Sequence, residues 1–422
     1  MTAFIITALK IIFLLGFLIT IHELGHFLVA KLCKVKVNEF AIGFGPKIWQ
    51  KQGKVTKYTL RLIPLGGYNS MEGEEQYSEE EGSFSKASIP KRIAIVLAGG
   101  MVNILFGIVT YFILMACVGN NTSLVVDSTM ENYAAQTAGV QAGDEIIKVN
   151  GKNVHLKTDL DEILEQNNGE EMTLTVKRGE EIQEITLTPT AVDAKSTGIY
   201  LRGTGAEGEA STKILMIEVG SSAEKAGLKE NDEIIKINGT EVKNQEEIIE
   251  AITNSELETI EFTVQRGSET LDVSLTPDTT PVYYLGIYFK MAENNLGNNL
   301  YYAFYQTGDF SFSIIDNLKM LVTGQVRANQ LMGPVGISEV VAQTTGVEDF
   351  VYLLALISLS LGVTNLLPIP ALDGGRIVLL LIEAIRRKRL SEKTEMNIQL
   401  IGFAFLITLS IYVAYNDILR IL

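Results

Sequence analysis

Four long apolar segments restrict, more than any other feature, what this chain can fold into. They run from about Ala3 to Ala30, from Ile93 to Val118, from Phe350 to Ile385 and from Ile398 to Tyr415. Each can supply the roughly 20 residues that a helix needs to cross a bilayer. No small-residue cleavage site follows the first segment, so we expect it to stay in the protein rather than act as a signal peptide. The sequence therefore predicts a polytopic α-helical membrane protein with four transmembrane helices.

Charge is distributed unevenly around these segments. Residues 119–300 contain 32 Asp and Glu against 14 Lys and Arg, whereas residues 31–61 contain eight basic residues and one acid, Glu39. Basic clusters mark the cytoplasmic side, and they follow the first segment, precede the second and follow the third. We therefore expect a multi-pass protein of the inner (plasma) membrane, with both termini and the acidic middle extracytoplasmic. Because these clusters adjoin segments that face the lipid bilayer, nothing indicates nucleic-acid binding.

The acidic middle is a duplication. AGVQAGDEIIKVNG at 138–151 recurs as AGLKENDEIIKING at 226–239, and GIY at 198–200 recurs at 286–288, both with an offset of 88 residues. Alternating runs with glycine turns predict strands, and the stretch between them predicts a short helix. The pattern resembles PDZ domains, which capture extended peptides beside a strand. A spacer or gate that binds nothing is the alternative.

These features predict five regions. They are an N-terminal membrane domain (1–118), a first PDZ-like α+β domain (119–203), a second (204–292), a connecting amphipathic segment (293–349) and a C-terminal membrane domain (350–422). Within the first region, residues 39–71 alternate around a turn at Gly53, which predicts a membrane-associated β-hairpin. Within the fourth, the apolar spacing of residues 308–345 suits a helix on the outer leaflet, as a gate or merely as packing.

The first apolar segment contains HELGH, which fits the pattern HExxH. On a helix, His22 and His26 project from one face one turn apart, so both can bind one zinc ion. Glu23 is then placed to take a proton from a water molecule bound to that zinc. The metal lowers the pKa of this water to about 7. Ionisable groups at membrane depth are costly and are usually functional, so a satisfied structural role for these three residues is disfavoured.

A catalytic zinc usually has three protein ligands and one open position. The third histidine of the chain, His155, lies in the duplicated middle. The remaining candidate is Asp373, in NLLPIPALDGGR at 365–376, where prolines and glycines interrupt an apolar segment. Irregular backbone at membrane depth is tolerated where it is buried in protein or lines a cavity. A helix-capping carboxylate is the alternative role for Asp373.

HELGH in the first segment together with NLLPIPALDGG near the C-terminus resembles the site-2 protease family of intramembrane zinc metalloproteases. The inserted pair of PDZ-like domains resembles the bacterial regulator-of-sigma-E protease branch. The resemblance implies that His22, His26 and Asp373 ligate Zn²⁺ and that Glu23 is the general base. It also implies that Asn365 is catalytic through contact with the substrate backbone or the developing oxyanion, for which a neutral amide donor is suited.

Further residues are implied by the same resemblance. The segment 39–71 is similar to the β-hairpin and GFGP loop of this family, so Gly43, Phe44 and Gly45 are expected to bind substrate as an added strand. A hairpin that only seals the fold is the alternative. Asn103, in AGGMVN of the second segment, is expected to hydrogen-bond toward the active site, although Met101 stands where relatives often have proline.

The leading hypothesis is an intramembrane zinc metalloendopeptidase that performs site-2 cleavage within the bilayer. The resemblance implies single-span substrates already clipped on the outer side, such as anti-sigma factors, and also leftover signal peptides. The PDZ-like pair would either exclude substrates with bulky ectodomains or bind the new peptide C-terminus. One alternative is a non-catalytic membrane adaptor that uses its PDZ domains to recruit partners. A cation transporter is disfavoured because the chain has no inverted repeat.

Overall fold

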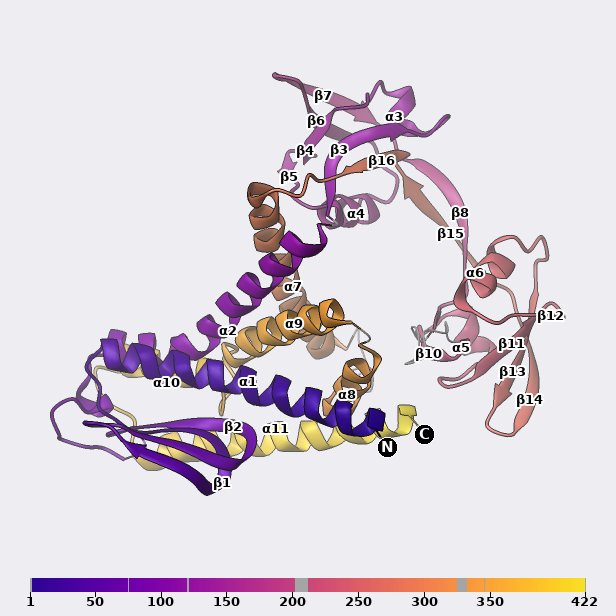
Figure 1. Ribbon diagram of the computed structural model, residues 1–422. Helices are drawn as coiled ribbons and strands as arrows, with labels where there is room; N and C mark the ends of the chain where they lie inside the picture. The colour runs from indigo at the N-terminus through magenta and orange to yellow at the C-terminus, as the bar shows by residue number, and fades with distance from the viewer. Residues whose placement is uncertain are drawn as a thin grey trace. The chain divides into compact units, whose positions relative to one another are not determined.

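The computed structural model describes residues 2–74, 76–119, 121–201, 212–324, 332–344 and 346–421. It divides into two compact units, one of Met1–Leu114 with Thr307–Ile418 and one of Met115–Gln306 with Leu419–Leu422. Within these described residues, four helices are long and apolar enough to cross a membrane, and Figure 1 labels them. They are α1 (Thr2–Leu32), α2 (Ile89–Val118), α9 (Val347–Asn365) and α11 (Glu392–Ile421).

The third predicted membrane segment, 350–385, is not one continuous helix. Helix α9 ends at Asn365, and α10 (Asp373–Arg386) begins after a break that contains Pro368 and Pro370. Proline lacks an N–H and disfavours helical backbone in the residue before it, so the helix stops here. A Cβ on Gly374 would lie 2.2 Å from two backbone carbonyl oxygens of the break. The glycine therefore lets α10 start directly against the end of α9, with Asp373 as its first residue.

Strands β1 (Val37–Gln52) and β2 (Lys57–Met71) form an antiparallel sheet whose turn is closed by the Gly53 N–H on the Thr56 carbonyl at 2.9 Å. The predicted hairpin forms, but its two strands pair in more than one place, which its sequence did not indicate. Residues 39–42 pair with 67–70 on one side and with 57–60 on the other, because both strands bend back on themselves. The bend in β1 uses positive φ angles of 85° and 82° at Gly43 and Gly45, which glycine adopts without strain.

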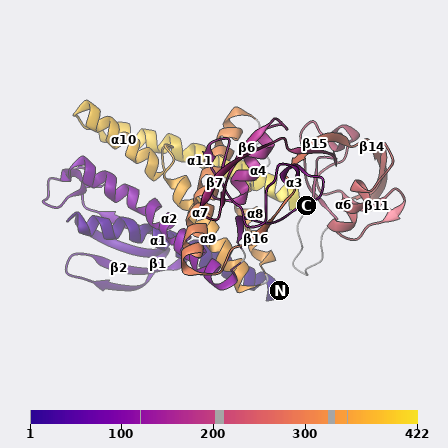
Figure 2. The same cartoon turned by 90° about the horizontal axis from the view of Figure 1, so that it is seen from above.

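One outer edge of this small sheet is the second half of β2, residues 67–71. Strand β2 lies beside α1, as Figures 1 and 2 both show. Apolar side chains of α1, β1, β2, α2 and α10 pack into one buried cluster that includes Ala30, Met71, Ile95 and Leu380. The sheet is thus fixed against the same helices that carry HELGH and Asp373.

The predicted amphipathic segment contains α7 (Leu296–Thr323) and α8 (Pro334–Gln343), while its residues 325–331 and 345 lie outside the described residues. Helix α8 packs against α1 through buried Val341. The N-terminus of α8 is capped from α11, because the Asp417 carboxylate accepts the N–H groups of Gly333 and Gly336 at 3.0 and 2.9 Å. A short 3₁₀ turn, η1 (Phe84–Lys86), precedes α2.

The second unit contains the two repeats, each an antiparallel sheet with two short helices. The first repeat has a sheet ordered β16-β3-β4-β6-β7 with β5 beside β4, and the second has the sheet β12-β11-β13-β14 with the pair β9-β10. The bounds in the first repeat are β3 (Thr122–Thr129), α3 (Ala134–Thr137), β4 (Glu145–Val149), β5 (Lys152–Asn153), α4 (Lys157–Gln166), β6 (Met172–Arg178), β7 (Glu181–Leu187) and β16 (Ile287–Met291). Those in the second are β9 (Ile199–Leu201), β10 (Ile214–Ile217), α5 (Ser222–Ala226), β11 (Glu233–Ile237), β12 (Thr240–Glu241), α6 (Gln245–Thr253), β13 (Ile260–Arg266) and β14 (Glu269–Leu275).

The repeats are nested rather than consecutive. Strand β16 pairs with β3, and Leu285, Ile287 and Phe289 join the core of the first repeat. The predicted boundaries assigned residues 204–292, which include β16, to the second domain. The structure corrects this prediction, because β16 belongs to the sheet of the first repeat. Two further strands, β8 (Thr190–Ser196) and β15 (Asp278–Tyr284), pair with each other where the chain enters and leaves the second repeat. The second repeat is therefore an insertion between β8 and β15.

Equivalent contacts in the two repeats keep the 88-residue offset. Arg178 donates to the buried Asp144 carboxylate at 2.7 Å, and Arg266 donates to Asp232 at 2.7 Å. The hydrogen bonds from Arg178 hold the pKa of Asp144 below its ordinary value. In each repeat this ion pair ties the last residue of one strand to the loop that precedes another. The same buried charge pair in both copies supports one ancestral fold for the two repeats.

Candidate metal centre and catalytic site

The two histidines of HELGH lie on one face of α1, as the i, i+4 spacing predicts. Their rings meet edge to face with centroids 4.7 Å apart, and His22 Nε2 lies 3.1 Å from His26 Nε2. His26 is buried, and its Nδ1 lies 2.8 Å from the carbonyl oxygen of Ile95 in α2. That carbonyl can only accept, so His26 carries its proton on Nδ1. Its Nε2 therefore presents a lone pair to His22.

Asp373 completes the group from the start of α10. Its Oδ2 lies 3.2 Å from His22 Nε2 and 3.3 Å from His26 Nε2. This oxygen is buried and accepts no hydrogen bond from any described residue. The structure thus brings together three predicted residues that are separated by up to 351 positions in the chain.

The donor set fits zinc. Ligand atoms around a tetrahedral zinc with bonds of 2.0 to 2.1 Å lie about 3.3 Å apart. The three observed separations, 3.1, 3.2 and 3.3 Å, match that spacing. Two imidazoles and one carboxylate are a common ligand set for catalytic zinc, and a buried carboxylate oxygen without a donor requires a positive partner. His22, His26 and Asp373 can therefore hold one divalent ion.

Asn365 lies at the edge of this group. Its side-chain amide nitrogen is 3.5 Å from His22 Nδ1, because α9 ends at Asn365 just before the break that leads to Asp373. The amide is therefore placed against the ring of a candidate ligand.

Glu23 follows His22 on α1 and faces the small sheet. Its Cγ lies 3.6 Å from the position that a Cβ on Gly67 would occupy, at the outer edge of β2. Any larger residue at 67 would also collide with the Ala41 carbonyl oxygen, at 2.7 Å. Glycine thus avoids a collision with the neighbouring strand, and the Cγ of Glu23 lies near this position on the edge strand. The sequence singled out Glu23 but gave no sign that Gly67 would contact it.

The remaining predicted substrate residues are placed differently from one another. Gly43, Phe44 and Gly45 form the bend of β1, where Phe44 is 46% exposed and its ring packs against Gly66. Asn103 is fully buried in α2, and its side-chain atoms hydrogen-bond to no described residue. Phe44 and Gly45 are therefore exposed, Gly43 is buried, and Asn103 is enclosed one helical turn beyond Gly99.

Gly99 of α2 is a site residue whose role the sequence revealed only as a small residue for helix packing. A Cβ at this position would lie 2.3 Å from His26 Nε2 and 2.7 Å from His22 Cε1. The two imidazoles therefore rest directly on the backbone of α2. The AGG run at 98–100 was the available signal, since such runs permit close helix approach.

Gly99→Ala is expected to push both rings out of position and to weaken zinc binding by roughly 10- to 100-fold, as changes around metal ligands do. Zinc retention against a competing chelator measures this effect in the purified protein. Gly308→Ala is the matched control, because Gly308 lies within α7 and a Cβ there meets nothing within 4 Å. Equal zinc retention by Gly99→Ala and the control would contradict the expectation.

The sequence model of peptidase family M50 matches residues 10–409. Among the similar proteins are the regulator of sigma-W protease RasP of Bacillus subtilis, 31% identical over 99% of both chains, and the regulator of sigma E protease of Haemophilus influenzae, 30% identical over 96% of both. The zinc metalloprotease RasP of Oceanobacillus iheyensis is 29% identical over 98% of this chain and 99% of its own.

Proposed function

Because the chain belongs to peptidase family M50 and is a zinc metalloprotease of the membrane, we propose that His22, His26 and Asp373 hold the zinc and that Glu23 is the general base. The observation that carries this proposal is the spacing of 3.1 to 3.3 Å among the three donor atoms, with Glu23 next to one of them in the chain. Among the described residues, no other group of His, Cys, Asp and Glu side chains is placed to hold a metal ion.

The chain's own residues divide the chemistry among them. Bound zinc supplies Lewis acidity that makes water nucleophilic near neutral pH. The Glu23 carboxylate accepts the proton that this water releases and then delivers it to the nitrogen of the leaving amine. The Ile95 carbonyl holds His26 in the tautomer that offers Nε2. The Asn365 amide donates to the oxygen on which negative charge develops.

Substrate positioning is assigned to the outer edge of β2, residues 67–71. A transmembrane helix must be unwound before its peptide bonds can be attacked, and an unwound segment can add to a free strand edge through backbone hydrogen bonds. The proximity of the Glu23 side chain to Gly67 supports this edge, because a strand placed there lies near the base. In this arrangement the bend at Gly43, Phe44 and Gly45, of which Phe44 and Gly45 are exposed, guides the substrate toward the edge.

Both repeats are assigned as PDZ domains. In the first, a pocket of about 550 Å³ lies between α4 and the segment that leads into β16. Leu160 and Leu164 line it from the helix, and Gly286 and Ile287 line it from the strand. Strand β16 is an edge of its sheet, so a peptide can pair with it beside α4. This groove suits the free C-terminus that an earlier cut would leave, although a barrier to bulky ectodomains remains the other role.

The substrates are assigned as single-span membrane proteins that another protease has already cut, with anti-sigma factors as the leading class. The names of the relatives from Bacillus subtilis and Haemophilus influenzae, regulators of sigma factors, support this class. The basic residues around the apolar segments support an orientation in the inner membrane with both termini and the PDZ pair outside and the metal centre toward the cytoplasm.

Reconstitution in liposomes with a tagged single-span substrate tests the assignment. We expect the substrate without its ectodomain to be cut and the intact substrate to be resistant. A clipped substrate with an amidated C-terminus separates the two PDZ roles, because slower cleavage indicates carboxylate binding and an unchanged rate indicates a barrier. Equal cleavage of clipped and intact substrates would contradict the requirement for a first cut, and cleavage of neither would favour a non-catalytic adaptor.

A further inference from the structure

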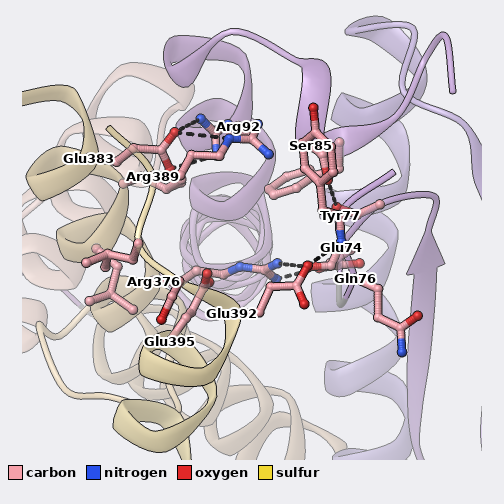
Figure 3. A pocket seen from close by; sticks show the side chains of 16 residues that line it. Glu74, Gln76, Tyr77, Ser85, Arg92, Arg376, Glu383, Arg389, Glu392 and Glu395 are labelled. Atoms are coloured by element: carbon pink, nitrogen blue, oxygen red, sulfur yellow. Dashed lines mark hydrogen bonds and ion pairs between the residues drawn. The ribbon is translucent and has the colours of Figure 1, made fainter. Parts of the chain in front are cut away.

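Helix α10 carries Asp373 and is fastened by two ion pairs on one of its faces. The first joins Arg376, one turn after Asp373, to Glu74, just beyond β2 (Figure 3). Arg376 Nη1 donates to Glu74 Oε1 at 2.5 Å, and Nη2 donates to the Glu74 carbonyl oxygen at 3.3 Å. The guanidinium group also lies 5.0 Å from the centre of the Phe84 ring. The guanidinium group of Arg376 is therefore held in a defined orientation by Glu74 and by the Phe84 ring.

The second ion pair joins Glu383, two turns farther along α10, to Arg92 of α2. The two Nη atoms of Arg92 donate to the two carboxylate oxygens at 3.0 and 2.6 Å, and Arg389 Nε lies 3.5 Å from the same carboxylate. The side chain of Arg92 is 8% exposed and that of Glu383 is 14% exposed. A bidentate pair shielded from solvent is strong and fixes the relative orientation of its two groups.

Both ion pairs end on elements that hold other parts of the catalytic site. Glu74 Oε2 accepts the N–H of Met71, the last residue of β2, at 3.3 Å, and Gly67 of the same strand lies near the Glu23 side chain. Arg92 lies one turn before Ile95, whose carbonyl orients His26. The two contacts thus connect the helix of the third zinc ligand to the strand beside the base and to the helix beside the histidines.

Apolar packing alone would not define the position of Asp373 sharply. Leu380 and Ile377 pack α10 against the shared cluster, but such contacts are non-directional. Zinc ligands have to be placed within about 0.2 Å of their ideal distances. The residues before α10 form an irregular break, and Leu372 makes no side-chain cap at its N-terminus. The ion pairs therefore fix the position of α10 along its neighbours, which the irregular break and the apolar contacts do not fix.

The same charged groups line a pocket of about 300 Å³ (Figure 3). Its guanidinium groups are those of Arg92, Arg376 and Arg389. Its carboxylates are those of Glu74, Glu383, Glu392 and Glu395. Since carboxylates outnumber guanidinium groups and the strongest contacts pair the two kinds, the pocket does not favour an anionic ligand. The network is better suited to joining α10 to its neighbours than to binding a small molecule.

We propose that Arg376 and Arg92 are positioning residues of the metal centre, which hold α10 so that Asp373 Oδ2 meets the two histidine nitrogens. This inference rests on the proposed ligand set of His22, His26 and Asp373. Neither arginine touches substrate or metal. Their contribution is to the geometry of the zinc site and hence to how tightly zinc is held.

Zinc retention of the purified full-length protein in detergent tests the proposal. The rate of zinc release to a colorimetric chelator is measured for Arg376→Met, Arg376→Lys and Arg61→Met. We expect Arg376→Met to release zinc roughly 10- to 100-fold faster, as losses of groups that support metal ligands do. Arg376→Lys keeps a charge for Glu74 and should be intermediate. Arg61→Met is the matched control, because Arg61 forms a similarly shielded ion pair with Glu39 within the small sheet.

The melting temperature of the metal-free protein separates positioning from a general loss of stability. Faster zinc release with an unchanged metal-free melting temperature supports the proposal. Zinc release at the wild-type rate overturns it, and so does a metal-free melting temperature that falls well below that of Arg61→Met. His22→Ala is measured alongside, since normal zinc retention in that variant would reject the ligand set itself rather than the role of Arg376.

Discussion

Glu23→Gln is expected to lower kcat by roughly 100- to 10,000-fold, the contribution of a well-placed general base. Glutamine has nearly the same shape as glutamate but cannot accept a proton from water at neutral pH. The zinc content should be unchanged, because Glu23 is not one of the three residues whose donor atoms lie together. KM should also change little, since the substrate contacts assigned to the edge of β2 remain. Single-turnover cleavage of a clipped substrate in liposomes measures kcat, and metal analysis of the same sample measures zinc.

Glu348→Gln is the control for the loss of a carboxylate, because Glu348 is exposed in the first turn of α9. Wild-type cleavage by Glu23→Gln would remove the general base from the mechanism. It would also remove the reason for an ionisable residue beside the metal group in a membrane helix. Loss of zinc together with activity would instead place Glu23 among the ligands.

Asp373→Ala is expected to weaken zinc binding by more than roughly 100-fold, beyond the effect of disturbing a supporting group. The remaining donors would be His22 and His26 on the same helix, and two ligands rarely hold a catalytic zinc. Cleavage should fall to background with the zinc content. The measurements are zinc stoichiometry after dialysis against a weak chelator and cleavage before and after excess zinc is restored.

Asp316→Ala serves as the matched control, because Asp316 is exposed on α7 and is not one of the three grouped residues. Stoichiometric zinc in dialysed Asp373→Ala would assign the third ligand elsewhere. Partial recovery of activity in excess zinc would agree with a weakened but intact site, since added metal can offset a lower affinity by mass action.

The histidine pair and the four membrane helices could be predicted because their signals are local. The HExxH spacing alone places His22 and His26 on one face of α1, whatever the rest of the fold does. Apolar length alone identifies helices that can cross a bilayer. Asp373 was a longer-range prediction, and it depended on there being few ionisable residues within the apolar segments. The contact of 3.2 Å between its carboxylate and His22 came from the fold.

The nesting of the repeats illustrates a limit of sequence reasoning. An offset of 88 residues establishes the duplication but does not say which copy uses a strand lying at their boundary. Pairing of β16 with β3 settles this in favour of the first repeat. The hydrogen bond of the Gly286 carbonyl with the Met130 N–H has its equivalent between Gly198 and Glu218. The first repeat therefore uses the GIY at 286–288 in the same way that the second repeat uses the GIY at 198–200.

The sequence by itself determined the features that depend on neighbouring residues: the membrane helices, the turn at Gly53, the duplication, and the pairing of a metal-binding face with an adjacent base. These follow from helical periodicity, segment length and residue chemistry within a few turns. The tertiary structure alone decided which backbones approach the site. It placed Gly99 beneath the imidazoles, Gly67 against Glu23, and Arg376 and Arg92 across from their carboxylates. Such contacts join distant segments through close packing, and many pairings of the same residues would satisfy the local patterns equally well.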